Sequence, residues 1–350
     1  TTFSLTTNDG RQIDTDTWRL ASWADGSAKW QAFAAVIPQG TDYCVLRKTD
    51  KKKVSKKNRQ SSKEENEEWG EIPPFYLTLN NKVMPVEKHE TERQGMVSML
   101  HKYSGRNFVM RAYSYKGSKE VKIVHTLIVD SVLNAEGLRE LGVHFKVPMH
   151  GEAYKRYVAF DDRRPMSVQP LIARRKIDMQ AMDSVTRSML DNIAKWDGFR
   201  LSQLSPNGHS IRKRTYTDAP WIGTIEGQRS EGVVTVGDSV ASTTFRMKDF
   251  WQSYPSTIQV DGARGDTAIV TLSLYSPEAE PYSFAHYDSI PHTLEAAYED
   301  VQPGMSTAWG IARTSTIYVN PETTTDRQLL PTPEYLHRKR AFGIWSLPAL

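Results

Sequence analysis

Short runs in which apolar and polar residues alternate occupy most of this chain, with turn-forming residues between them. In residues 121–129 (VKIVHTLIV) one face carries Val, Ile, His, Leu and Val, and the other face is also largely apolar. Because alternate residues of a strand point to opposite faces, this pattern predicts an inner strand of a packed sandwich. His125 lies on the apolar face and is predicted to be a hydrogen-bonded core residue rather than a catalyst.

The same alternation predicts many further strands. They are expected at residues 3–7, 75–79, 108–113, 142–147, 232–236, 243–247, 257–260, 267–275 and 314–319. Apolar stretches also flank Asp25 and Gly26, a dipeptide typical of a hairpin turn. Helical spacing is confined to residues 177–193 and a short stretch at 293–300. The chain is therefore predicted to be all-β, with two β domains in sequence.

Composition agrees with a folded protein. The chain has 350 residues, of which 39% are hydrophobic and 25% charged, enough for a sizeable core. Its single cysteine, Cys44, excludes a disulfide framework within the chain. The opening residues, TTFSLTTNDG, lack the pattern of a signal peptide, and no apolar run approaches the length of a membrane span.

The net charge of +4 comes from one block. Residues 47–68 hold nine Lys or Arg and five Asp or Glu, so the remainder of the chain is neutral. The block has no apolar periodicity and no interleaved aromatic residues, which favours a solvated or disordered surface insertion over a nucleic-acid tether. A nucleic-acid partner is not expected, and neither is a membrane.

Five motifs in a fixed order carry a resemblance to a known family. They are WADGSAKW (23–30), RAYSYKGSKEVKIVHTLIVD (111–130), RYVAF (156–160), FRMKDFWQSYP (245–255) and the segment 275–316, which contains AHYD, YED and GIARTS. Together they resemble the exo-rhamnogalacturonan lyases of polysaccharide lyase family 26 and their bacterial relatives.

The resemblance implies a domain order. Residues 1–74 would form most of an N-terminal RIFT-related barrel that carries the charged insertion 47–68. Residues 75–325 would form the central antiparallel β-sandwich, and residues 326–350 would lead toward an α/α toroid that this chain lacks. The expected partners are that toroid of the same parent chain and an acidic plant cell-wall polysaccharide or oligosaccharide. The family also suggests an extracellular protein.

Elimination across a uronic acid sets clear chemical requirements. A base must remove the C5 proton, a cation must neutralise the adjacent carboxylate, and an acid must protonate the leaving oxygen. By resemblance, the candidate catalytic residues are His286, Tyr287 and Glu299. A structural role is the alternative for each, since a His beside a Tyr can simply hydrogen-bond a strand.

Substrate contacts are expected from two segments. Arg313, in the GIARTS motif, is the first candidate for holding a uronate, because its planar fork matches a carboxylate. Its alternative is a buried structural pair with Glu299 or Asp300. The remaining candidates for substrate binding are Tyr298, Arg246, Trp251 and Gln252. Strand alternation would put Arg246, Lys248 and Phe250 on one face, and Trp251 can equally be a core residue.

Two other function classes stay open. A noncatalytic carbohydrate-binding or scaffold module needs no base, and a glycoside hydrolase would pair Glu299 with Asp249. No cysteine and histidine cluster with zinc spacing, no serine-hydrolase motif and no phosphate-binding glycine loop is present in the sequence. No cofactor is therefore expected, and the use of calcium stays open.

Overall fold

A computed structural model describes residues 2–38, 40–49, 69–161, 165–168, 183–191, 194–284, 308–321 and 331–340. These residues form mainly antiparallel strands, which confirms the predicted all-β class. The helices among them are short: α1 (Ser131–Glu136), α2 (Ser184–Asp191), α4 (Pro333–Arg338) and one turn of 3-10 helix, η2 (Ala153–Lys155). Of the two predicted helices, α2 lies inside 177–193, and 293–300 lies outside the described residues.

Two large sheets make the sandwich. The nine-stranded sheet has the order β14 (Met166–Ser167), β13 (Tyr157–Phe160), β18 (Val233–Gly237), β19 (Ser242–Met247), β22 (Ala312–Val319), β11 (Val121–Ile128), β10 (Phe108–Tyr115), β9 (Ser98–Gly105) and β8 (Lys88–Gln94). The eight-stranded sheet has the order β17 (Ile222–Gly227), β16 (Gly208–Arg214), β15 (Gly198–Ser205), β20 (Ser256–Asp261), β21 (Thr267–Tyr275), β12 (Leu141–Pro148), β6 (Phe75–Leu79) and β7 (Lys82–Met84).

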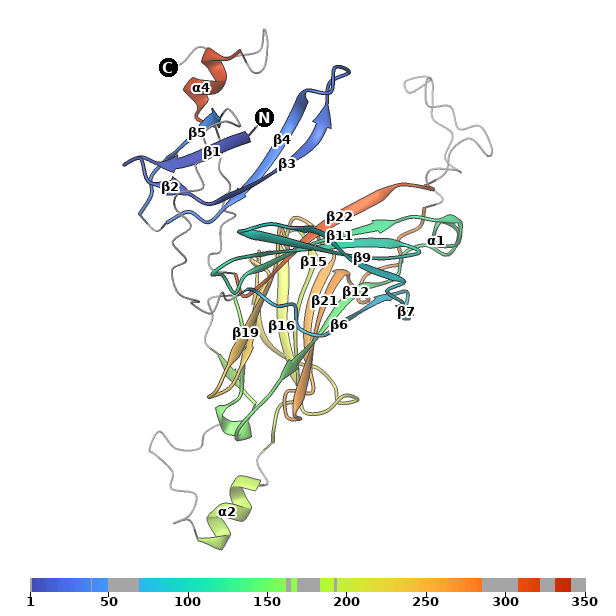
Figure 1. Cartoon of the computed structure of the whole chain (residues 1–350). Helices are drawn as coiled ribbons and strands as arrows, with labels where there is room; N and C mark the ends of the chain where they lie inside the picture. The colour runs from blue at the N-terminus through green and yellow to red at the C-terminus, as the bar shows by residue number, and fades with distance from the viewer. Residues whose placement is uncertain are drawn as a thin grey trace.

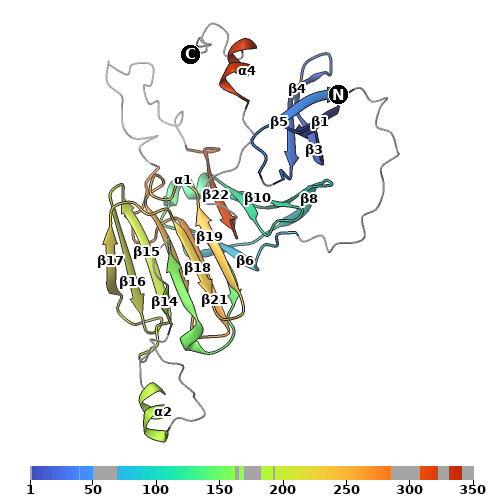
Figure 2. The same cartoon turned by 90° about the vertical axis from the view of Figure 1, so that its left-hand side faces the viewer.

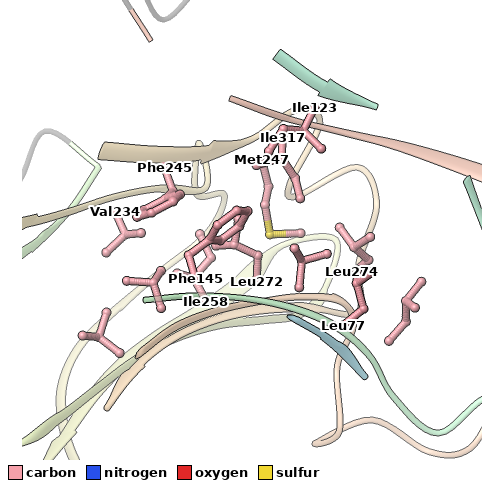
Figure 3. Packing of buried hydrophobic residues seen from close by; sticks show 14 of the residues in the cluster. Leu77, Ile123, Phe145, Val234, Phe245, Met247, Ile258, Leu272, Leu274 and Ile317 are labelled. Carbon is pink, nitrogen blue, oxygen red and sulfur yellow. The ribbon is translucent and has the colours of Figure 1, made fainter. Parts of the chain in front are cut away.

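The core fills the space between these two sheets. Phe145 on β12 meets Phe245 on β19 with ring centroids 4.8 Å apart, and both side chains are fully buried. Figure 3 shows Leu272 and Ile258 of one sheet facing Met247 and Ile317 of the other. Most inward-facing residues of the central strands are apolar, and burying that face is the main favourable term that holds the layers together.

Strand β11 is an inner strand, as predicted, since it lies between β10 and β22. Its inward face is fully buried and its outward face is half-buried. His125 on the inward face has no exposed surface, and its ring lies 6.0 Å from that of Phe108. Among the described residues neither ring nitrogen has a hydrogen-bond partner, so the prediction of a hydrogen-bonded core histidine is wrong in that respect.

The N-terminal strands form two small sheets at one end of the sandwich (Figures 1 and 2). One contains β2 (Gln12–Ile13), β1 (Thr2–Thr7) and β5 (Cys44–Thr49), and the other is the hairpin β3 (Thr15–Ser22) and β4 (Ala28–Ala35). The hairpin turn at Asp25 and Gly26 is confirmed: Gly26 has φ +77°, and the Asp25 carboxylate accepts the Ser27 N–H at 2.8 Å.

The prediction of a solvated or disordered insertion at residues 47–68 is wrong for its first residues. Residues 47–49, placed in a disordered insertion, belong to β5 and pair with β1, where Arg47 lies opposite Ser4. The strand extends into the basic run because pairing satisfies its backbone groups whatever the side chains are. Residues 50–68 lie outside the described residues. At Trp69 the chain already pairs with the sandwich at Lys116, five residues before the expected domain boundary.

Candidate functional site

A small cavity lies where the end of β19 meets the first half of β22. Its volume is about 150 Å³. The residues that line it are Met247, Lys248, Asp249, Ser253, Ser256, Leu274, Arg313, Thr314, Ser315 and Thr316. Two motifs that lie sixty residues apart in the sequence, FRMKDFWQSYP and GIARTS, thus share one cavity.

The chain turns sharply after β19 to form one wall of this cavity. Asp249 has φ +55°, and its carbonyl accepts the Ser253 N–H at 2.8 Å. Phe250 anchors the turn, since its side chain is buried in the core with 1% of its surface exposed. It packs against Gly232 (φ +72°), where an added Cβ would come within 2.3 Å of the Phe250 Cβ. A glycine is required there for both reasons.

This turn overturns one prediction. Arg246, Lys248 and Phe250 do not share a face, because the strand ends at Met247 and regular alternation ends with it. Arg246 lies opposite Tyr318 in the sheet, and its guanidinium is 5.7 Å from the Tyr318 ring centroid. Arg246 is not among the residues that line the cavity.

Arg313 projects from β22 on the face that points between the sheets, since its partner Leu127 is buried there. Its Nη2 donates to the Ser253 carbonyl at 3.3 Å. Desolvation by surrounding protein atoms lowers the pKa of Arg313, and the nearby Tyr275 opposes that shift. Arg313 is nevertheless an exposed residue, so a ligand can reach its guanidinium.

The charge of Arg313 has no acidic partner in the described part of the chain. No described carboxylate forms a salt bridge with it. The two candidates for a structural pair, Glu299 and Asp300, lie outside the described residues. An exposed guanidinium without an acidic partner can donate hydrogen bonds to the carboxylate of a ligand.

Trp251 and Gln252 lie on the same turn but outside the cavity lining. Trp251 is half-buried, and the guanidinium of Arg229 lies 4.2 Å from its ring centroid. Gln252 is exposed. The structure therefore brings Arg313 together with Lys248 and Asp249 in one cavity, while Arg246, Trp251 and Gln252 are not part of its lining.

His286, Tyr287, Tyr298 and Glu299 all fall in residues 285–307, outside the described residues. Both ends of that segment are anchored next to α1. Before it, Tyr282 exchanges two backbone hydrogen bonds with Leu138, at 2.8 and 2.9 Å. After it, the Ala308 N–H donates to the Asn134 side chain at 3.1 Å. The start of β22 lies at the same end, since the Ile311 carbonyl accepts the Val129 N–H.

A second polar group, not found from the sequence, covers part of the outer face of the eight-stranded sheet. Arg200 binds Glu278 at 3.0 Å and donates to the Gln259 side chain at 2.7 Å. Arg200 and Arg214 both lie over the Trp221 ring, at 4.2 and 4.3 Å from its centroid. Each cation has a protein partner, which favours a structural role. In the sequence, the polar residues that alternate with apolar ones in β15 and β16 could have indicated this group.

The described residues lack two features. They contain no group of three or more His, Cys, Asp or Glu arranged to hold a metal ion. None of their helices has the length and apolarity to cross a bilayer.

Comparison with known proteins shows that a PcRGLX-like family model matches each of the two parts of the chain. The model described as PcRGLX-like protein central beta sandwich domain matches residues 39–332. The model described as PcRGLX-like N-terminal RIFT barrel domain matches residues 1–52. Among curated proteins, "Uncharacterized protein YetA" of Bacillus subtilis (strain 168) is 26% identical over 273 residues. That alignment covers 69% of this chain and 32% of YetA, so the chain spans about a third of that relative's length.

Proposed function

Because this chain belongs to the PcRGLX-like family, we propose that it supplies the barrel and sandwich of a polysaccharide lyase that cleaves rhamnogalacturonan. The family match confirms the resemblance drawn from the motifs, and the all-β architecture of barrel and sandwich with it. The proposed reaction is β-elimination at the rhamnose to galacturonate linkage, from a chain end.

The observation that supports this function best is the state of Arg313. Its guanidinium lines a cavity, is exposed to solvent and has no ion-pair partner among the described residues. Elimination from a uronic acid requires a cation at the substrate carboxylate, because the C5 proton becomes acidic enough only when the developing charge is stabilised. Arginine suits this task, since two parallel N–H groups can hold both carboxylate oxygens.

The proton transfers are assigned to the segment anchored beside α1. In this proposal His286 and Tyr287 act as base or acid, and Glu299 protonates the departing oxygen. Tyr298, Trp251, Gln252 and Arg246 would contact neighbouring sugars. The support is positional, since Tyr282 and Ala308, which flank the segment, lie at the end of the sandwich where β22 begins.

The proposed partners follow from the same chemistry. The substrate is an acidic plant cell-wall polysaccharide or oligosaccharide, because the cavity offers a cation, hydroxyl groups and backbone carbonyls. An α/α toroid of the same parent protein would close the other side of the cleft, and secretion would bring the enzyme to its polymer.

The test uses the full-length protein that contains this chain, incubated with rhamnogalacturonan. A lyase releases products with a conjugated double bond, which absorb in the ultraviolet. New reducing ends without that absorbance would contradict the proposal in favour of hydrolysis by Glu299 and Asp249. Binding without any new chain ends would contradict it in favour of a noncatalytic module.

A further inference from the structure

Two histidines on neighbouring strands bring their ring nitrogens together far from the Arg313 cavity. His89 on β8 and His101 on β9 lie with Nε2 and Nδ1 3.3 Å apart. In the antiparallel register His89 is opposite Tyr103, and Thr91 is opposite His101. The two imidazoles are therefore diagonal neighbours on one face of the hairpin, within reach of each other.

A ladder of aromatic rings fixes the position of His89. Its ring stacks on Tyr103 with centroids 4.3 Å apart and planes 2° from parallel. Tyr103 meets Phe75 edge to face at 5.2 Å, and Phe75 contacts the core residue Phe145 at 6.4 Å. A side chain locked in this way loses little rotamer freedom when it binds a ligand, which favours affinity.

The nitrogen separation suits chelation of one metal ion. Zinc binds imidazole nitrogen at about 2.0–2.1 Å, and two ligands at a tetrahedral angle then lie about 3.3–3.4 Å apart. The observed 3.3 Å, which is a hydrogen-bond contact between the two rings, matches that separation. Thr91 adds a hydroxyl oxygen 3.4 Å from His101 Nδ1, on the same side.

The nearby ammonium groups of Lys88 and Lys102 are both held by Glu90, at 2.5 and 3.1 Å. These contacts compensate the positive charges nearest in sequence to the pair.

We propose that His89 and His101 chelate a divalent transition metal ion of zinc type, which pins the edge strand β8 to β9, with water completing the coordination. Strand β8 is the last strand of its sheet and is paired only with β9. The turn that joins the two strands also carries the contact with the N-terminal hairpin at Asp16. A bound ion would stabilise the part of the sandwich on which the N-terminal strands are docked.

The experiment titrates the full chain with Zn²⁺ alone and follows heat release and melting temperature. One site is expected, with a rise in melting temperature on saturation. His89→Gln and His101→Gln should each weaken binding by more than about tenfold, because even groups that only support a ligand contribute about ten- to a hundredfold. His150→Gln is the matched control, an exposed histidine paired with Asp238 on another part of the sandwich. Ca²⁺ should not compete, since it prefers oxygen ligands.

A second variant tests the proposal by a gain of affinity for Zn²⁺. Thr91→Cys adds a thiolate next to the pair and should tighten Zn²⁺ binding. This test remains informative even if the histidine variants do not fold. The proposal is overturned if the unmodified chain shows no Zn²⁺ binding in the micromolar range. It is equally overturned if the His89 and His101 variants bind as the control does, or if Thr91→Cys leaves the affinity unchanged.

Discussion

The carboxylate of Asp16 accepts both the backbone N–H and the hydroxyl of Ser98, each at 2.7 Å. The same carboxylate also accepts the N–H groups of Met96 and Val97 at 2.7 and 3.1 Å. Asp16 belongs to the N-terminal hairpin and Ser98 to the sandwich, so one side chain joins the two parts. Arg93 adds a second link, since its guanidinium lies 3.4 Å from the centroid of the Trp18 ring.

Replacing this carboxylate should weaken the junction. Asp16→Ala leaves the turn at Met96 to Ser98 without its acceptor, and hydrogen bonds to a charged group contribute about 1.5–3 kcal/mol. We expect a loss of stability in that range and faster proteolysis between the two parts. Urea denaturation measures the first and limited proteolysis the second. Asp42→Asn, an exposed carboxylate of the N-terminal part, is the control.

The same contact predicts a pH dependence. Burial raises the pKa of Asp16, but the Ser98 hydroxyl and three backbone N–H groups outweigh it and lower the pKa below the ordinary value. The stabilisation is therefore complete above the unfolded-state pKa and is lost as the pH falls through the lower pKa of the folded state. If Asp16→Ala loses as much stability between neutral and acid pH as the unmodified protein, this assignment is wrong.

His125 predicts a pH dependence at a higher range. Burial lowers its pKa to about 4 in the folded state, against 6.5 for the exposed group. As the pH falls below 6.5, His125 becomes protonated in the unfolded state but stays neutral in the folded state. The free energy of unfolding therefore decreases until the pH reaches about 4. Between pH 7.5 and pH 5 the cost is about 2 kcal/mol, at about 1.4 kcal/mol per pKa unit.

His125→Leu should remove that loss. Denaturation curves at pH 7.5 and pH 5 should show that the free energy of unfolding of the variant, relative to that of the unmodified protein, is higher at pH 5 than at pH 7.5. His150→Gln, an exposed histidine paired with Asp238, is the matched control and should show no such gain. Equal pH dependence in His125→Leu and the unmodified protein would mean that His125 is protonated in the folded state.

How far the sequence predicts this fold depends on the kind of pattern involved. Strand β21 was predicted with its bounds, since strict alternation and flanking turns define it. Strands β15 and β16 were missed, because their outward residues include Arg and Ser that pair with Glu278 and Asp261 only after folding. The turn after Met247 was also missed, since nothing in the local sequence shows that Gly232 makes room for Phe250.

The candidate site was predictable in part for a related reason. Strand pairing across the sandwich brings the 245–255 motif and Arg313 together, and the resemblance pointed to both. The His89 and His101 pair carried no sequence signal, because cross-strand neighbours twelve residues apart become visible only once the register is known.

The charged segment gives a prediction about folding. Residues 51–68 contain seven Lys or Arg and four Glu, and they connect β5 to Trp69. Replacing them with a Gly-Ser linker of equal length should keep cooperative thermal unfolding and lower the isoelectric point. Loss of cooperativity in the melting curve would show instead that this segment is part of the fold.

A further prediction concerns the chain by itself. If the cleft needs a toroid on its other side, these 350 residues should bind rhamnogalacturonan fragments weakly and release little or no unsaturated product. Calorimetry and ultraviolet absorbance measure the two quantities. Robust turnover by the isolated chain would place the whole active site on the barrel and sandwich.

The most direct test of the proposed function is the rate of unsaturated product formation by full-length Arg313→Ala, measured together with its melting temperature. Arg111→Ala is the matched control, since Arg111 is a strand arginine held on the surface by Glu92 at 2.7 Å. We predict that Arg313→Ala lowers turnover by about a hundredfold or more, as expected when one preorganised electrostatic contact is removed. Arg313→Lys should recover only part of the rate, and the melting temperature should stay close to that of the control. A collapse of the melting temperature, with normal specific activity in the fraction that remains folded, would contradict this account and make Arg313 a structural residue.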